Sequence, residues 1–147
     1  MKFKYQALTH KLVDCPPTIY EGKKGAFYRW VFTECGEESF TPVLIINPQR
    51  QFDNDDLTCE GYALSMFEQE QGAFQKYKNL VSKKPQLKKV FGTMIAHLNL
   101  SDDEGVCSEY EINNYSHFNF HEHEGTDLTK KVITIVPIFD KNGEFKR

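Results

Sequence analysis

Short segments in which apolar and polar residues alternate, or in which aromatic and β-branched residues predominate, recur along this chain. Both patterns are typical of β-strands with one or both faces buried. They predict strands at 26–33, 40–46, 93–100, 106–112, 115–121 and 131–139. Residues 1–12 alternate more weakly and are a candidate for a further short strand. We expect 26–33 and 40–46 to pair as a hairpin, and 106–112 to pair with 115–121 through a turn at Asn113-Asn114.

The middle of the chain has a different period. From 57 to 81, apolar residues fall at the three- and four-residue spacing of an amphipathic helix. Gly61 and Gly72 interrupt this spacing, so the helix either begins after Gly61 or bends near Gly72. A short helix is predicted to open at Pro85, which suits a first helical turn, and to end at Gly92. The middle of the chain should therefore contain one long and one short helix.

Strands followed by helices and then by strands indicate an α+β fold rather than alternating βαβ units. We predict a mostly antiparallel sheet of about six strands. The helical insert, with its long and short helix, should lie between the N-terminal hairpin and the C-terminal strands. The 147 residues contain no internal repeat or linker-like segment, and their number suits a single compact domain over 1–147.

Composition and charge narrow the classes of function. Apolar residues make up 39% of the chain and aromatic residues 14%, a content typical of folded proteins and too high for disorder. With a net charge of −3, the chain as a whole is not a general nucleic-acid binder. No apolar run approaches the roughly 20 residues of a membrane-spanning helix, and the first residues lack the apolar core of a signal peptide. We therefore expect a soluble, cytoplasmic protein that does not contact membranes.

The cysteines agree with this expectation. The chain has four of them, widely spaced and without a Cys-x-x-Cys pair, at Cys15, Cys35, Cys59 and Cys107. In a protein without a secretion signal, reduced and mostly buried thiols are the expected state.

The segment His117–His123 is the part of the chain most like a functional site. Because alternate side chains of a strand share a face, Phe118 and Phe120 should point into the core. The opposite face then carries His117, Asn119, His121 and His123. The simplest interpretation is the polar face of an amphipathic strand.

Imidazoles two residues apart can also ligate one divalent metal ion such as zinc. The loop after the strand could supply carboxylate oxygens. The candidate metal ligands are therefore His121, His123, Glu124 and Asp127.

Without a metal, the same histidines suit other chemistry. An imidazole titrates near neutral pH and can act as a general acid or base, or it can bind a polar ligand. The candidate ligand-binding residues are His117, Asn119, His121 and Arg50, the last of which lies in the polar loop 47–56. His97 would join this group if its strand lay beside 115–121.

Charged segments suggest what the protein contacts. Six lysines between Lys76 and Lys89 form a local basic patch, the one place where we expect nucleic-acid contact. Acidic residues predominate from 102 to 111, and such segregated charge suits docking to another protein or self-association. No nucleophile elbow, P-loop or dinucleotide-binding glycine pattern is present.

The sequence thus favours a small cytosolic binding or interaction domain, a non-catalytic subunit of a larger complex. The alternative is a metal-dependent or histidine-based enzyme with its site on the strand His117–His123.

Overall fold

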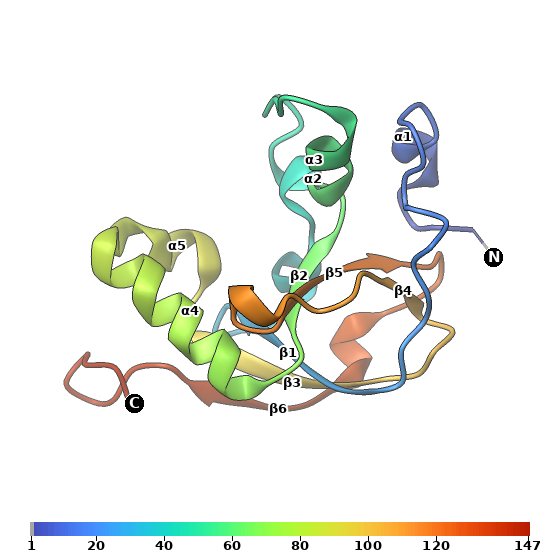
Figure 1. Ribbon diagram of the computed structural model, residues 1–147. Coiled ribbons are helices and arrows are strands. Elements are labelled where there is room, and N and C mark those ends of the chain that lie inside the picture. Colours follow the sequence, from blue (N-terminus) through green and yellow to red (C-terminus); the bar gives the residue numbers. More distant parts are fainter. Residues whose placement is uncertain (1) are drawn as a thin grey trace.

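One six-stranded antiparallel sheet forms the centre of the protein, in a computed structural model that describes residues 2–147 (Figure 1). Its strand order is β4-β5-β2-β1-β3-β6. The strands are β1 (Gly25–Val31), β2 (Leu64–Phe67), β3 (Met94–Leu100), β4 (Gly105–Cys107), β5 (His117–Glu122) and β6 (Val132–Pro137). The helices are α1 (Gln6–Thr9), α2 (Val43–Ile46), α3 (Asp55–Glu60), α4 (Glu70–Lys83) and α5 (Lys88–Phe91). The predicted α+β class and the antiparallel sheet of about six strands are confirmed.

Alternation along the strands sorts their side chains between two hydrophobic clusters. One cluster lies on the face that Phe118 and Phe120 of β5 share with Phe27 of β1, and the rings of Phe27 and Phe118 meet edge to face at 5.1 Å. Leu64 and Met66 of β2 belong to the same cluster because each pairs with one of the two phenylalanines, Leu64 with Phe120 and Met66 with Phe118. The predicted inward direction of Phe118 and Phe120 is therefore confirmed.

Helix α4 covers part of the opposite face of the sheet. Its buried side chains pack with Phe67 and Ile95 of the sheet and with Ile138. They are Ala73, Phe74, Tyr77 and Val81. The helix contains Gly72 because the chain at Tyr115 passes very close to it, so that a Cβ at position 72 would overlap the Tyr115 carbonyl. Gly72 thus permits a close approach within α4, which is continuous from Glu70 to Lys83.

The predicted helix from 57 to 81 is wrong as one element. The structure divides this stretch into α3, strand β2 and helix α4. Helix α3 begins after Asn54, whose side chain accepts a hydrogen bond from the Leu57 amide, and it ends at Gly61. The four residues of β2 then alternate and pair with β5, a tertiary contact that overrides the helical spacing.

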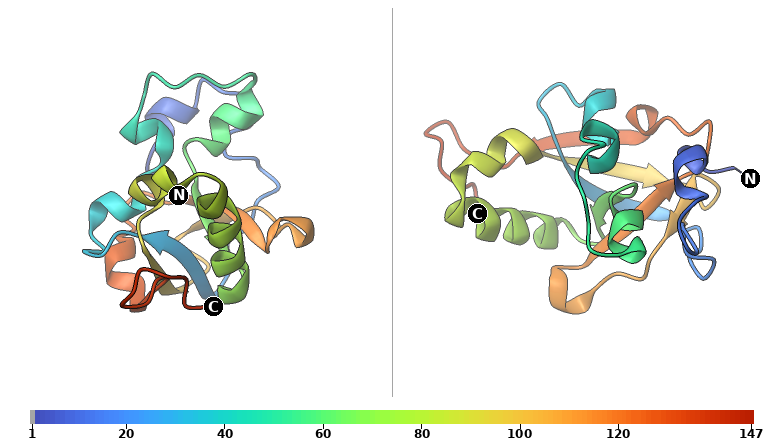
Figure 2. Two further views of the ribbon diagram at one scale, coloured as in Figure 1. Left: turned by 90° about the vertical axis from the view of Figure 1, so that its left-hand side faces the viewer. Right: turned by 90° about the horizontal axis from the view of Figure 1, so that it is seen from above.

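The predicted hairpin of 26–33 with 40–46 is also wrong. Strand β1 forms as expected, but residues 43–46 are the helix α2, which begins directly after Pro42. Short apolar runs such as 43–46 fit a strand or a buried helical turn equally well. Helices α2 and α3 form a lobe that rises from the sheet, seen in teal and green in the left view of Figure 2. We call residues 37–60 the insert lobe.

The N-terminal residues form an arm rather than the predicted strand at 1–12. A single bridge joins Phe3 to His123, and α1 follows. A disulfide bond between Cys15 and Cys59 ties the arm to the insert lobe. The prediction of reduced thiols is therefore wrong for this pair, and Cys35 and Cys107 are free. Because disulfides are typical of oxidising compartments, the cysteines no longer support a cytoplasmic location, which stays a prediction.

The C-terminal half follows its sequence pattern more closely. Strands β3, β5 and β6 form where they were predicted. Strand β4 is shorter than the predicted 106–112, and a 3₁₀ turn at Ile112–Asn114 replaces the tight hairpin. Gly92 has a φ of 82° and ends α5, as predicted. Among residues 2–147, no helix has the length and apolar character needed to cross a membrane.

Candidate functional site

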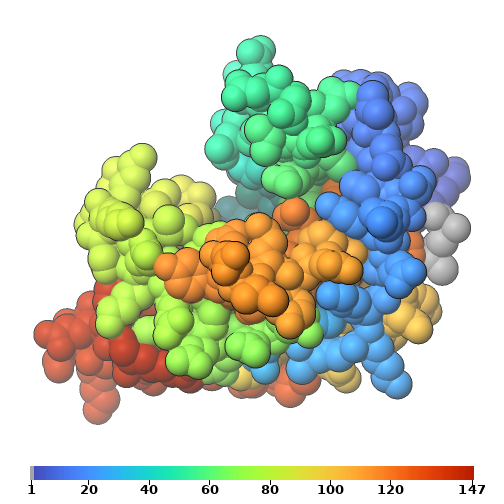
Figure 3. Space-filling view, viewed as in Figure 1, coloured from blue at the N-terminus to red at the C-terminus, as the bar shows by residue number. Residues whose placement is uncertain are grey.

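A fork between β1 and β2 creates a cavity that contains three of the predicted ligand-binding residues. The two neighbouring strands are paired at one position alone, Tyr28 with Phe67. Beyond it, β1 stays with β3 and β2 stays with β5, so Trp30 and Ser65 have no partner across the fork. The cavity above it has a volume of about 430 Å³, which lies in the range of small-molecule sites. Figure 3 shows the hollow between α5 and the insert lobe.

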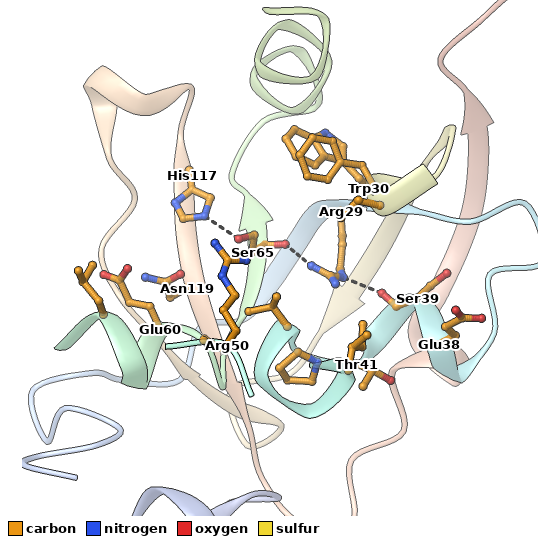
Figure 4. A pocket seen from close by; sticks show the side chains of 18 of the residues that line it. Arg29, Trp30, Glu38, Ser39, Thr41, Arg50, Glu60, Ser65, His117 and Asn119 are labelled. Atoms are coloured by element: carbon orange, nitrogen blue, oxygen red, sulfur yellow. Dashed lines mark hydrogen bonds between the residues drawn. The ribbon is translucent and has the colours of Figure 1, made fainter. Parts of the chain in front are cut away.

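The walls of the cavity are mostly apolar and come from both sides of the fork. Trp30 of β1 and Phe91 of α5 stack at 4.6 Å between ring centres, and the Trp30 indole N–H donates to the Ala73 carbonyl at 2.8 Å. The insert lobe supplies most of the remaining apolar surface through Val43, Ile46, Phe52 and Leu57. Nine of the twenty residues that line the cavity have polar side chains, and Figure 4 shows that they come from the strands at the fork and from the insert lobe. The cavity therefore suits a ligand with an apolar body and a polar end.

Arg29 spans the fork. Its Nε donates to the Ser39 carbonyl at 2.9 Å and its Nη1 to the Ser65 carbonyl at 2.8 Å, as drawn in Figure 4. A guanidinium has more N–H donors than these two bonds use. Burial lowers the pKa of Arg29 to about 10, so the group remains positively charged at neutral pH. The charge of Glu122 opposes this lowering of the Arg29 pKa. The Glu122 carboxylate is itself paired with Lys4, whose Nζ is 3.3 Å from Oε2.

A second arginine and two glutamates stand at the rim. Arg50 is exposed and lies over the Phe52 ring at 5.0 Å. Within residues 2–147, neither Arg29 nor Arg50 has a carboxylate oxygen within 4.0 Å. Glu38 and Glu60 also line the cavity, but both are exposed, so solvent screens their charges. Partial burial, together with the charges of Glu111 and Asp56, raises the pKa of Glu60.

His117 and Asn119 of β5 line the same cavity, as does Arg50, so the structure brings these three candidate ligand-binding residues together. Asn119 is buried, and its side-chain amide has no hydrogen-bond partner among the described residues. The His117 ring lies between two groups. Its Nε2 is 3.0 Å from Ser65 Oγ, and its Nδ1 is 3.0 Å from Glu111 Oε1.

The protonation states of this chain of groups follow from their surroundings. Burial lowers the pKa of His117, although the hydrogen bond to Glu111 opposes that shift. The same hydrogen bond lowers the pKa of Glu111. At neutral pH the imidazole is therefore neutral and the carboxylate ionised. His117 can donate Nδ1–H to Glu111 while its Nε2 accepts the Ser65 hydroxyl proton.

His121 does not reach the cavity, although it was predicted to be part of the ligand site. Its side chain is 4% exposed and lies beside the disulfide, with Nε2 at 4.0 Å from Cys59 Sγ and the Tyr20 ring 6.1 Å away. Burial lowers the pKa of His121 to about 4. The face of the strand is the predicted one, but the arm and α3 cover this end of it.

The predicted metal set is not assembled. His123 lies against Phe3 and points its Nδ1 at the Asp103 carbonyl, 2.8 Å away. Asp127 instead caps the 3₁₀ turn at Leu128–Lys131, and Glu124 is exposed. Among residues 2–147, no group of three or more histidine, cysteine, aspartate and glutamate side chains has the arrangement of a metal site.

Two further predicted features have other roles. His97 lies on β3, which β2 and β1 separate from β5, and its Nε2 is 2.7 Å from Glu70 Oε2. It therefore cannot join the histidines of β5. In the lysine patch, Lys76 donates to Asn114, while Lys78 lies over the Phe145 ring. Part of the patch is therefore engaged within the protein.

Sequence reasoning did not find Arg29, Ser65 or Glu111. Arg29 had a detectable signal, because it is a single charged residue inside the aromatic strand 26–33. Ser65 was not found because it fell within the predicted helix 57–81, whereas it lies on strand β2. Glu111 lies beside His117 because an isolated β-bridge joins the two residues. The local sequence pattern does not predict this bridge.

Comparisons of the chain with models of protein families, with curated protein sequences and with solved structures found no match.

Proposed function

We propose that this protein binds a small amphipathic anion, such as an organic carboxylate, in the cavity at the fork between β1 and β2. The observation that carries the proposal is Arg29, a half-buried cation at the fork with no carboxylate oxygen within 4.0 Å among the described residues. A charge removed from water is costly unless an opposite charge or hydrogen bonds compensate it. Arg29 already donates hydrogen bonds to two backbone carbonyls. A ligand carboxylate would accept its remaining N–H groups and supply the opposite charge.

The position of the charges decides between an anion and a cation. The glutamates at the cavity are exposed, whereas Arg29 lies at the fork with reduced access to water. Electrostatic interactions are stronger where water is excluded, so the inner part of the cavity is electropositive. Arg50 and the uncommitted amide of Asn119 add donors beside it. The apolar walls would then contact the body of the ligand.

The binding of octanoate, with octanamide as its uncharged counterpart, tests the proposal. Trp30 is the single tryptophan of the chain and lines the cavity, so its fluorescence reports occupancy directly. We expect octanoate to change that fluorescence at saturable concentrations and octanamide to bind more weakly. Arg50 is exposed, so solvent screens its charge, and an exposed ion pair contributes up to about 1 kcal/mol. Arg50→Gln should therefore weaken octanoate binding by up to about fivefold.

Arg50 is the residue to change because it is exposed and makes no hydrogen bond through its guanidinium among the described residues. Lys83→Gln is the matched control, since Lys83 is an exposed cation outside the cavity. It should leave binding unchanged. Equal affinity for octanoate and octanamide, or an Arg50→Gln variant that binds like the original protein, would overturn the proposal. The earlier prediction of a protein partner stays a prediction.

A further inference from the structure

The chain of hydrogen bonds from Ser65 through His117 to Glu111 does more than a binding cavity requires. Both ring nitrogens of His117 are engaged, one by a carboxylate and one by a hydroxyl, each at 3.0 Å. This is the arrangement in which a neutral imidazole takes a proton from a serine while a carboxylate orients the ring. Ser65 is exposed to the cavity, and His117 is largely buried behind it.

Backbone pairing places these groups. Phe67 pairs with His117, and Ser65 lies two residues earlier on the same face of β2, so Ser65 and His117 are diagonal neighbours on adjacent strands. On the other side of β5, the Glu111 amide donates to the His117 carbonyl at 2.8 Å. The three side chains therefore come from three neighbouring stretches of backbone.

We propose that Ser65 is a nucleophile and His117 its general base in the hydrolysis of carboxylic esters that carry an anionic group. The anionic group follows from the proposed function, on which this substrate class rests. Glu111 is a positioning residue, because it acts through the His117 ring and does not line the cavity.

The reaction balances without a further reactant. His117 accepts the Ser65 proton as Oγ bonds to the ester carbonyl carbon. The C–O bond to the alcohol then breaks, and the leaving alkoxide takes that proton and departs as an alcohol. Water attacks the acyl-serine, gives one proton through His117 back to Ser65 Oγ, and releases the carboxylic acid.

Arg29 is placed to offset charge during this reaction. Its Nη1 is 2.8 Å from the Ser65 carbonyl oxygen, so the guanidinium contacts the backbone of the residue that carries the nucleophile. Its remaining N–H groups are donors for the oxygen that becomes negative when the ester carbonyl is attacked. Arg50, farther out, would hold the anionic group of the substrate.

Two esters of one chain length test the proposal: 4-nitrophenyl hexanoate, which is neutral, and mono-4-nitrophenyl adipate, which adds a carboxylate. We expect the adipate ester to be hydrolysed with the higher kcat/KM. Ser65→Ala should remove turnover, and His117→Gln should lower it about a hundredfold or more. Ser82→Ala, at an exposed serine of α4, is the matched control and should leave turnover unchanged.

A fluorophosphonate reagent provides a second measurement, because it bonds covalently to activated serines. We expect peptide mass spectrometry to find the adduct on Ser65 and none on Ser82. Turnover that survives Ser65→Ala, or the absence of an adduct on Ser65, would overturn the proposal. Octanoate binding that persists in that case would leave the proposed function standing. Equal hydrolysis of both esters, unchanged by Arg50→Gln, would instead overturn the substrate class.

The role of Glu111 has its own measurement. His117 faces Glu111, which raises its pKa, and Lys76 of α4, whose charge lowers it. In Glu111→Gln the rise is lost, so the acidic limb of the kcat/KM profile should move to lower pH as the rate falls. Glu109→Gln, at an exposed neighbour, should move neither. A Glu111→Gln profile that matches the original would overturn the positioning role.

Discussion

The two ends of strand β5 present the same kind of side chain on the same face and differ in almost every other property. At one end, His117 opens on the cavity and bonds to Ser65 and Glu111. At the other end, His121 is buried beside the disulfide and has no charged partner among residues 2–147. Alternation decided which face each histidine took. Segments distant in the sequence, the arm and α3, decided which of them became accessible.

Removal of the disulfide should have the largest effect on the difference between the two ends of β5. The bond joins residues 44 positions apart, and closing a loop of that length stabilises a fold by about 4 kcal/mol in the chain-entropy description. We expect the double variant Cys15→Ser, Cys59→Ser to lose up to that much free energy of unfolding, measured by urea denaturation. Cys35→Ser, at a free cysteine, should lose less than about 1 kcal/mol.

Hydrogen exchange would then show where the change lies. In the double variant, backbone amides near His121 should exchange faster, while those near His117 keep their protection. Equal loss of protection at both ends of β5 would contradict the division that we describe.

Acidification should have a smaller effect than removal of the disulfide, and His121 should contribute more than His117 to the loss of unfolding free energy. The pKa of His121 is about 4 in the folded protein and about 6.5 in an unfolded chain. Between these values the unfolded state binds more protons, so stability falls as the pH falls from about 6.5 towards 4. The loss assignable to His121 is about 3 kcal/mol by linkage.

Urea unfolding at neutral pH and near pH 4 measures this loss. His121→Gln should lose less stability than the original protein over that range. His117→Gln should change the pH dependence in the same direction but less, because Glu111 opposes the effect of burial on His117. A pH dependence that His121→Gln leaves intact would show that His121 is not desolvated in the way the structure indicates.

The smallest effect is expected beyond the end of β5. His123 is partly exposed, and its partners are the Asp103 carbonyl and the Phe3 ring. His123→Ala should change the free energy of unfolding by about 0.5 kcal/mol or less. Excess Zn²⁺ should leave the Tm of the original protein and of this variant unchanged. A Zn²⁺-dependent rise in Tm that disappears in His123→Ala would restore the predicted metal site.

The sequence predicts where most strands lie and which way their side chains point, but it says little about which strands pair side by side. Alternation, or a high content of aromatic and β-branched residues, located β1, β3, β5 and β6, and alternation gave the directions of Phe118 and His117. The four-residue strand β2 was missed because its pairing with β5, and not its own pattern, makes it a strand.

The candidate site divides in the same way. Arg50, His117 and Asn119 stood out by residue type and meet at one cavity. Ser65 and Glu111 gain their importance from strands that lie beside β5, and a strand order of β5-β2-β1 cannot be derived from the periodicity of any one segment. For His121 the residue type was misleading. It suggested a functional site, but the side chain is buried and a ligand cannot reach it.

The disulfide has a topological consequence as well. Cys15 and Cys59 close a covalent ring that includes the central strand β1 and most of the insert lobe. A protease that cuts the exposed loop around Arg50 would therefore open the ring without releasing a fragment. The nicked protein would keep its mass on a non-reducing gel and separate into two pieces when a thiol reductant is added.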